Sequence, residues 1–107
     1  MTGTPRAFEV SVDDTNGSPI VHVAGEVDMD TAPRLEQRLL ELAQAGAPLI
    51  TVDLADTDFI DSTGLHAIVV AVKELRAYGA DLVLRAPSPS TARVLELSGL
   101  TTVVKVV

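Results

Sequence analysis

The sequence contains no cysteine and no tryptophan, and its aromatic side chains are two phenylalanines and one tyrosine. Without cysteine the chain forms no disulfide, no thiolate metal site and no thiol-based catalytic centre, a composition that fits a reducing compartment. Aromatic residues make up 3% of the chain and hydrophobic residues 47%, so a folded core has to be aliphatic. The composition therefore predicts a globular protein with an aliphatic core.

Positive charge is also scarce, because 8 lysines and arginines stand against 15 aspartates and glutamates and give a net charge of −7. Such a surface repels the phosphates of nucleic acids and anionic lipid headgroups. No apolar run has membrane-spanning length, and no apolar signal-peptide segment follows residues 1–6. We therefore expect a cytoplasmic protein that binds neither nucleic acid nor membrane.

A length of 107 residues suits a single domain covering residues 1–107. Hydrophobic periodicity and turn residues predict this order of elements: strands at 8–12 and 20–27, a helix from about 31 to 46, a strand at 49–54, a helix at 62–78, a strand at 82–86, a helix at 88–99 and a strand at 102–107. The order predicts an α/β fold with a leading hairpin. The alternation in several strands favours helices mainly on one face of the sheet.

Strand-helix-strand connections make their flanking strands parallel, so several loops should meet at one edge of the sheet. These loops contain Asp28, the segment 58–62 and Pro87-Ser88. Pro33 and Pro89 fit the first turns of their helices, with Asp30 or Thr31 and Ser88 as the expected N-caps. The sequence therefore predicts that polar groups gather where the parallel strands end.

The segment Phe59-Ile60-Asp61-Ser62-Thr63-Gly64-Leu65 places two hydroxyls beside a carboxylate at the predicted start of a helix. Ser62 is the expected N-cap, its side-chain oxygen accepting a hydrogen bond from the amide of Gly64 or Leu65. A helix N-terminus also tolerates the charge of about −1.5 to −2 that phosphorylation adds. Gly64 is expected to let another molecule approach closely. We interpret the segment as a regulatory serine on a small binding module.

A metal-dependent or phosphotransfer site is the main alternative, because five carboxylates are predicted near the same edge: Asp28, Asp30, Asp56, Asp58 and Asp61. A receiver-type phosphotransfer domain needs an acidic pair before a helix and a lysine after the last strand. Here Asp13-Asp14 precede a hairpin, and Lys105 lies within the last predicted strand. Carboxylates also cap helices and occupy solvated loops, so we assign no metal site and no cofactor.

Nucleophilic catalysis is a weaker alternative, because a serine nucleophile needs a nearby base and the histidines are His22 and His66. His66 follows Ser62 by four positions and could approach it, but it is more simply a half-exposed helix residue. Gly64 stands alone and makes no glycine-rich phosphate loop. We therefore predict no catalytic residue and no enzymatic activity.

Three stretches of this sequence resemble the STAS domain, and within it the bacterial anti-sigma-factor antagonists. They are Gly25-Glu26-Val27-Asp28 with Thr31-Ala32, the segment from Phe59 to Leu65, and Ser88-Pro89 with Leu97-Ser98-Gly99-Leu100. They occur in the family's order and spacing and cover nearly the whole chain. The resemblance implies a STAS-like mixed β-sheet.

The resemblance also implies a cycle of partner binding. The unphosphorylated protein would bind an anti-sigma factor that is also an ATP-dependent serine kinase, and so release the sigma factor. Phosphorylation of Ser62 would end that binding, and a PP2C-type phosphatase would restore it. The partner-binding residues expected on this basis are Asp28, Asp58, Asp61, Ser62, Thr63 and Gly64.

Two other functions stay open from the sequence. One is a STAS module that scaffolds another complex without being phosphorylated, in which Ser62 is only a helix cap. The other is a small acidic metal-dependent phosphotransfer protein.

Overall fold

The computed structural model describes residues 7–14 and 17–107 and has the predicted α/β order. The elements are β1 (Glu9–Asp13), β2 (Ile20–Val27), α1 (Ala32–Gln44), β3 (Leu49–Ile60), α2 (Ser62–Ala77), β4 (Asp81–Arg85), α3 (Pro89–Leu97), the 3₁₀ helix η1 (Leu100–Thr102) and β5 (Lys105–Val106). Residues 1–6, which bear on the signal-peptide prediction, and residues 15–16 of the predicted turn lie outside the described residues.

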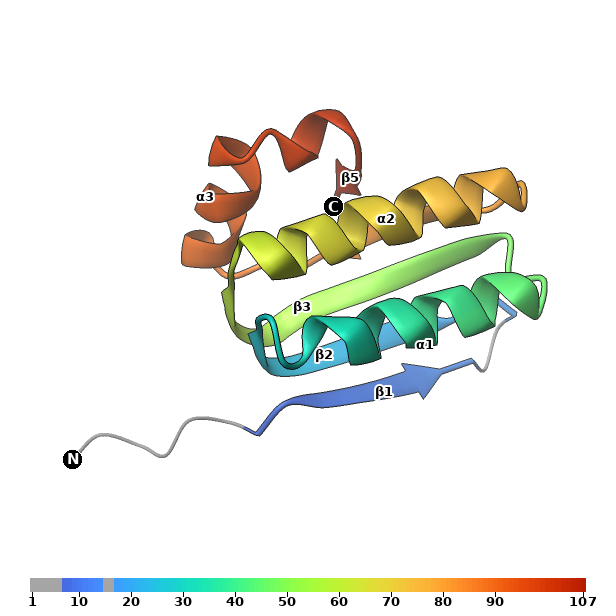
Figure 1. The fold of residues 1–107 in the computed structure, drawn as a ribbon, viewed down its shortest axis with the longest axis horizontal. Helices are drawn as coiled ribbons and strands as arrows, with labels where there is room; N and C mark the ends of the chain where they lie inside the picture. Colours follow the sequence, from blue (N-terminus) through green and yellow to red (C-terminus); the bar gives the residue numbers. More distant parts are fainter. Residues whose placement is uncertain (1–6, 15–16) are drawn as a thin grey trace.

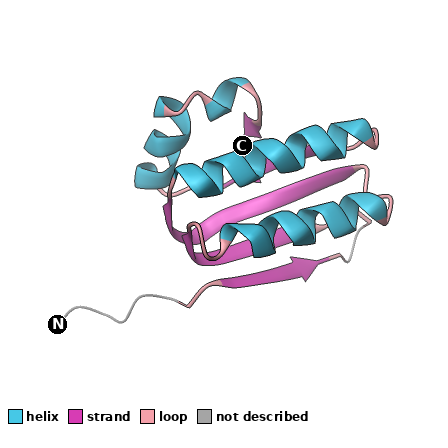
Figure 2. Cartoon of the chain, viewed as in Figure 1, coloured by secondary structure: helices cyan, strands magenta, loops and turns pink. Residues whose placement is uncertain are grey.

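The strands form one mixed sheet in the order β1-β2-β3-β4-β5 (Figure 1). β1 pairs with β2 in antiparallel fashion, and the remaining neighbours are parallel. The predicted leading hairpin is thereby confirmed. Helices α1 and α2 lie side by side across one face of the sheet (Figure 2), while α3 follows β4 and contacts β3. The mixed sheet with helices mainly on one face is as predicted.

The core is aliphatic, as the composition predicts, and lies between the sheet and helices α1 and α2. Its largest fully buried side chains include Val21, Val23, Val27, Leu35, Leu39, Ile50, Leu54, Ile68, Leu75, Leu82 and Leu84. The strand members recur at every second position and the helix members at helical spacing, which fixes which faces turn inward. Each such side chain stabilises the fold by about 1.5–3 kcal/mol relative to an exposed one.

Strand β3 is longer than predicted, because the expected loop at 55–58 is part of the strand. β2 continues to pair with it, from Ala24 opposite Asp56 to Val27 opposite Ile60. Register shifts within this pairing accommodate the irregular stretch. Thr57, which looked like a loop residue, is buried and donates its hydroxyl hydrogen to the carbonyl oxygen of Val23 over 2.8 Å. Pairing with β2 therefore overrides the turn-like composition.

The last predicted strand, 102–107, is mostly not a strand. Leu100–Thr102 form η1, and β5 consists of Lys105–Val106 alone. Gly99 ends α3 with a positive φ of 80°, and the following turn buries Leu100 and Val104. The valine-rich composition indicated a strand by propensity, whereas burial of these two side chains requires a tighter turn.

Candidate functional site

The ends of β2 and β3 bring the loop at Asp28 next to the start of α2. Val27 pairs with Ile60, and the amide of Asp61 donates to the carbonyl oxygen of Val27 over 3.1 Å. The predicted meeting of Asp28 with the residues before α2 is therefore observed. Strand β4 ends earlier along the sheet than β3 does. Its last residue, Arg85, pairs with Asp53, whereas β3 continues beyond that point to Ile60.

Asp61 is the N-cap of α2, and the prediction that Ser62 fills this position is wrong. The Asp61 carboxylate oxygen Oδ1 accepts from the amide of Gly64 over 3.0 Å. The Asp61 carbonyl oxygen accepts from the amide of Leu65 over 2.9 Å. Aspartate and serine are equally good caps, so adjacent ones leave a one-residue ambiguity in the sequence. Ser62 is the first helical residue, and it and Thr63 are exposed.

Gly64 is buried where the first turn of α2 meets the end of β2. A Cβ atom at this position would lie 2.8 Å from the carbonyl oxygen of Val27, 2.8 Å from Val27 Cγ1 and 2.7 Å from Ile60 Cγ1. These distances are too short for a carbon atom. The close approach expected of another molecule is therefore made by β2 of this chain, and a partner contact of Gly64 stays a prediction.

Asp28 organises the loop between β2 and α1 through its carboxylate. Its Oδ1 accepts from the amide of Asp30 over 2.9 Å and from the amide of Thr31 over 3.1 Å. The Thr31 hydroxyl oxygen accepts from the Asp28 amide over 2.9 Å and lies 2.7 Å from the carbonyl oxygen of Glu26, to which it donates. Thr31 occupies the N-cap position of α1, but its side chain makes no cap hydrogen bond to the helix. The expected capping role of Asp30 or Thr31 is therefore replaced by bonds within the loop.

A shallow groove between α1 and α2 begins at Thr63, the residue after Ser62. It has a volume of about 120 Å³ and is lined by Ala32, Pro33, Glu36, Thr63, His66 and Ala67. His66 is exposed, more so than the predicted half-exposed position, and within residues 7–14 and 17–107 it makes no hydrogen bond to Ser62. The site therefore combines exposed hydroxyls, carboxylates and a small groove, without a base held against the serine.

The carboxylates considered for a metal site are spread over three elements. Asp28 lies in the β2-α1 loop, Asp61 caps α2, and Asp56 and Asp58 lie exposed along β3. In the described part of the chain, no three histidine, aspartate or glutamate side chains are grouped so that they could hold a metal ion. A separate search of the same residues finds no helix with the length and apolarity needed to cross a membrane.

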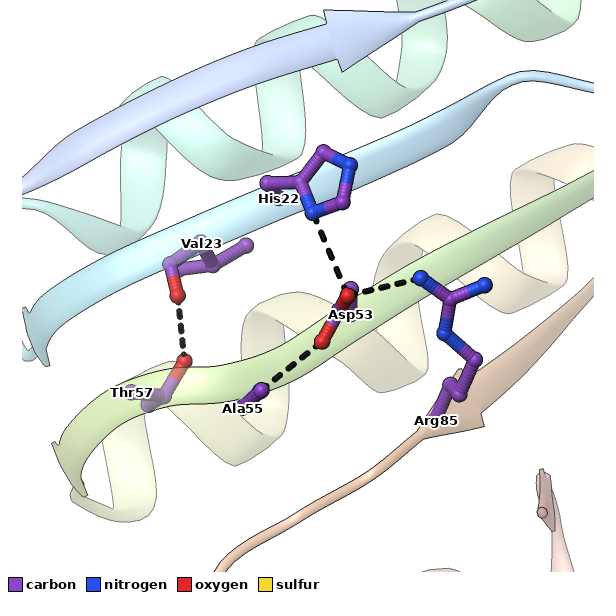
Figure 3. A network of polar contacts seen from close by, with 6 residues as sticks. All are labelled: His22, Val23, Asp53, Ala55, Thr57 and Arg85. Atoms are coloured by element: carbon purple, nitrogen blue, oxygen red, sulfur yellow. Dashed lines mark hydrogen bonds and ion pairs between the residues drawn. The ribbon is translucent and has the colours of Figure 1, made fainter.

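A second polar cluster, which the sequence reasoning missed, lies on strands β2, β3 and β4 (Figure 3). Asp53 Oδ2 accepts from the Arg85 guanidinium over 2.7 Å and lies 3.2 Å from His22 Nδ1, while Oδ1 accepts from the Ala55 amide over 2.9 Å. Burial raises the pKa of Asp53. The Arg85 hydrogen bond, the Ala55 amide and the charges of Arg85 and His22 outweigh it and hold the pKa below its ordinary value of 3.8.

The Asp53 network should make stability depend on pH. A carboxylate whose pKa is lowered by folding contributes stability above its unfolded pKa, and that stability is lost as the pH falls through the folded pKa. At pH 7, Asp53→Asn should therefore lower the free energy of unfolding by about 1–2 kcal/mol. The difference from wild type should shrink once the pH falls below 3.8. Urea unfolding at neutral pH and at a pH of about 2.5 measures both values.

Asp81→Asn is the matched control for that experiment, because Asp81 is 54% exposed in its ion pair with Arg76. Exposed pairs contribute only about 0–1 kcal/mol. A difference between wild type and Asp53→Asn that stayed constant from neutral to acid pH would contradict the assignment of the effect to the ionised carboxylate.

The family model and the relatives described next lead to one family. The STAS domain family model matches residues 9–107. The Anti-sigma-B factor antagonist of Listeria monocytogenes is 33% identical over 100 residues, which is 94% of this chain and 87% of that protein. The crystal structure of an anti-sigma factor antagonist from Mycobacterium paratuberculosis superposes with a TM-score of 0.85 at 30% identity, covering 98% of this chain and 89% of that one.

A more distant likeness shows the same fold. The anti-sigma factor antagonist SpoIIAA in its unphosphorylated form superposes with a TM-score of 0.76 at 24% identity, covering 94% of this chain and 88% of that chain. The phosphorylated form of SpoIIAA, described as a Bacillus cell fate determinant, gives a TM-score of 0.69 at 24% identity, covering 94% and 91%.

Proposed function

Since this chain belongs to the STAS domain family, we propose that it is an anti-sigma-factor antagonist whose partner binding is controlled by phosphorylation of Ser62. In its unphosphorylated form it binds an anti-sigma factor and thereby releases the sigma factor. The anti-sigma factor is also the serine kinase that uses ATP to modify Ser62, and a PP2C-type phosphatase removes the phosphate. The chain acts in the cytoplasm and is itself no enzyme.

The observation that carries this proposal is the separation of the cap from the hydroxyl. Asp61 makes the cap hydrogen bond to Gly64, so the exposed Ser62 hydroxyl is not needed to start α2. A kinase can therefore engage that hydroxyl without undoing the helix. The first amides of a helix have no partner within it and favour negative charge, so a phosphate at this position is compatible with the fold.

The chemistry belongs to the kinase, and this chain supplies the acceptor. The Ser62 oxygen forms a bond to the γ-phosphorus of ATP, the bond to the β-phosphate oxygen breaks, ADP leaves, and the hydroxyl proton passes to a base of the kinase. The product carries about −1.5 to −2 charges beside the carboxylate of Asp61 and near the loop of Asp28. A partner surface shaped around an uncharged hydroxyl no longer fits this group.

The same geometry weighs against the two other functions. In the scaffold alternative Ser62 is only a cap, and the cap is Asp61. In the phosphotransfer alternative several carboxylates converge, whereas Asp56 and Asp58 lie along β3 and Asp61 is held by Gly64.

Peptide mass analysis after incubation with native-host lysate, with and without ATP, tests the proposal. We expect ATP-dependent phosphate on Ser62 in the wild type and none at this position in Ser62→Ala. Ser90→Ala is the matched control, because Ser90 is an exposed hydroxyl in the first turn of another helix, α3, and its loss should leave the modification of Ser62 intact. Absence of phosphate on Ser62, while a known kinase substrate in the same lysate is modified normally, would favour the scaffold alternative.

A further inference from the structure

Met29 is an apolar side chain exposed at the edge of the molecule that carries Ser62. It lies between Asp28 and Asp30 in the loop from β2 to α1, and 71% of its surface is accessible to solvent. The only other methionine in the sequence is Met1. Met29 is open to water and flanked by two carboxylates. Its apolar surface therefore contributes no burial free energy to the fold in this position.

The loop that presents Met29 is held in one conformation by hydrogen bonds on both sides of it. Asp28 Oδ1 accepts from the amides of Asp30 and Thr31, and the Thr31 hydroxyl joins the amide of Asp28 to the carbonyl oxygen of Glu26. The amide of Ala32 adds a bond of 2.8 Å to the Asp28 carbonyl oxygen. A partner that contacts Met29 therefore has little loop entropy to overcome.

The base of this loop is also the base of α2. Val27, which precedes the loop, accepts from the amide of Asp61 and contacts the first turn of α2 at Gly64. Met29 and the exposed Ser62 therefore project from two chain segments joined at one point. Because the two segments adjoin at one edge of the sheet, a single partner surface can contact both.

Single exposed apolar residues are common and need no function by themselves. Leu97 on α3 is such a residue, with 76% of its surface exposed. Met29 differs because hydrogen bonds hold its loop, a backbone bond joins the base of that loop to the residue before Ser62, and two aspartates flank it in the sequence. Methionine adapts its shape to a partner, and apolar anchors in desolvated pockets carry most of the energy of an interface.

We propose that Met29 is an anchor of the partner-binding surface. Its side chain inserts into an apolar pocket on the anti-sigma factor, and cationic side chains border that pocket. The carboxylates of Asp28, Asp30 and Asp61 favour that border, because they attract cationic groups of a partner and repel acidic ones. This inference rests on the proposed function. It adds which kinds of side chain the anti-sigma factor presents to Met29 and to the aspartates.

Calorimetric titration against the purified anti-sigma factor kinases encoded by the native host tests the anchor. Met29→Ala should weaken binding by about tenfold to a hundredfold. Met29→Leu should stay within about threefold of wild type, since it keeps the apolar volume. Leu97→Ala, the equally exposed control, should bind like wild type.

No binding by the wild type would overturn the proposed function and this inference with it. Equal binding by wild type and Met29→Ala would overturn the anchor alone.

Oxidation by hydrogen peroxide gives an independent measurement on the same complex. Peroxide transfers one oxygen atom to the thioether sulfur, which loses two electrons and becomes a sulfoxide, while the peroxide leaves as water. We expect Met29 to oxidise quickly in the free protein and slowly in the complex. Oxidised wild type should bind more weakly, and Met29→Leu should bind equally well before and after peroxide. Equal oxidation rates in the free and bound states would overturn the proposal.

Discussion

Replacing Gly64 with alanine is expected to lower the free energy of unfolding by about 2–3 kcal/mol, because the added methyl group has no space. It would meet the carbonyl oxygen of Val27 at 2.8 Å and Ile60 Cγ1 at 2.7 Å. At the end of β2 the carbonyl accepts a hydrogen bond from the amide of Asp61, so relief of the contact requires α2 to move away from the sheet. Urea unfolding followed by circular dichroism measures the loss.

The sign of the Gly64→Ala effect on stability is informative, because alanine in a helix is more favourable than glycine by about 1 kcal/mol. Without a steric conflict the substitution would therefore stabilise the protein. Thr63→Ala, in the same turn but exposed, provides the control and should change stability by no more than about 0.5 kcal/mol. A Gly64→Ala protein as stable as wild type would contradict the direct packing of α2 on Val27.

Phosphorylation of Ser62 is expected to weaken binding to the anti-sigma factor by about a hundredfold or more and to leave the fold intact. An uncompensated charge in a closely packed interface costs about 3–5 kcal/mol, and each 1.4 kcal/mol is a factor of ten in affinity. Within the free protein the same charge lies at a helix N-terminus, where it is tolerated. Calorimetric titration of the two forms, together with their thermal unfolding, separates the two effects.

The control for this experiment has to add charge at a comparable place outside the site. Ser90 is an exposed serine in the first turn of α3, so Ser90→Asp and Ser62→Asp change the net charge equally. Ser62→Asp should weaken binding and Ser90→Asp should not. Equal loss of affinity in both variants would mean that overall charge, and not the position of Ser62, decides binding. Unfolding of the phosphorylated protein would contradict the expected tolerance of α2.

The sequence predicts those parts of the fold where local pattern and tertiary structure agree. The bounds of β2 and the start of α2 at Ser62 are as predicted. Ser88 caps α3 by accepting from the amide of Thr91, also as predicted. For α2 and α3, hydrophobic periodicity and a capping residue near the helix start indicate the same structure, and for β2 the turn residues that bound the apolar run do so.

The remaining features depend on partners distant in the sequence. β3 extends to Ile60 because β2 pairs with it, although its polar residues indicate a loop. The hydrogen bond between Arg85 and Asp53 joins residues on different strands, and no local pattern predicts it. The predicted cap of α2, Ser62, is one position too late. Asp61 and Ser62 are both good capping residues, and the local sequence does not favour either of them. Met29, an apolar residue between two aspartates, is visible in the sequence, but composition alone does not assign it to the candidate site.

Because Asp61 starts α2, natural selection can act on position 62 separately from selection on folding. If the proposed kinase is lost in a lineage, the serine can be replaced by drift, and a different kinase can recruit another acceptor there, with little effect on thermostability. The same independence is useful for protein engineering. A cysteine, tyrosine or noncanonical residue placed at position 62 would change the regulatory input while the scaffold beneath it stays the same.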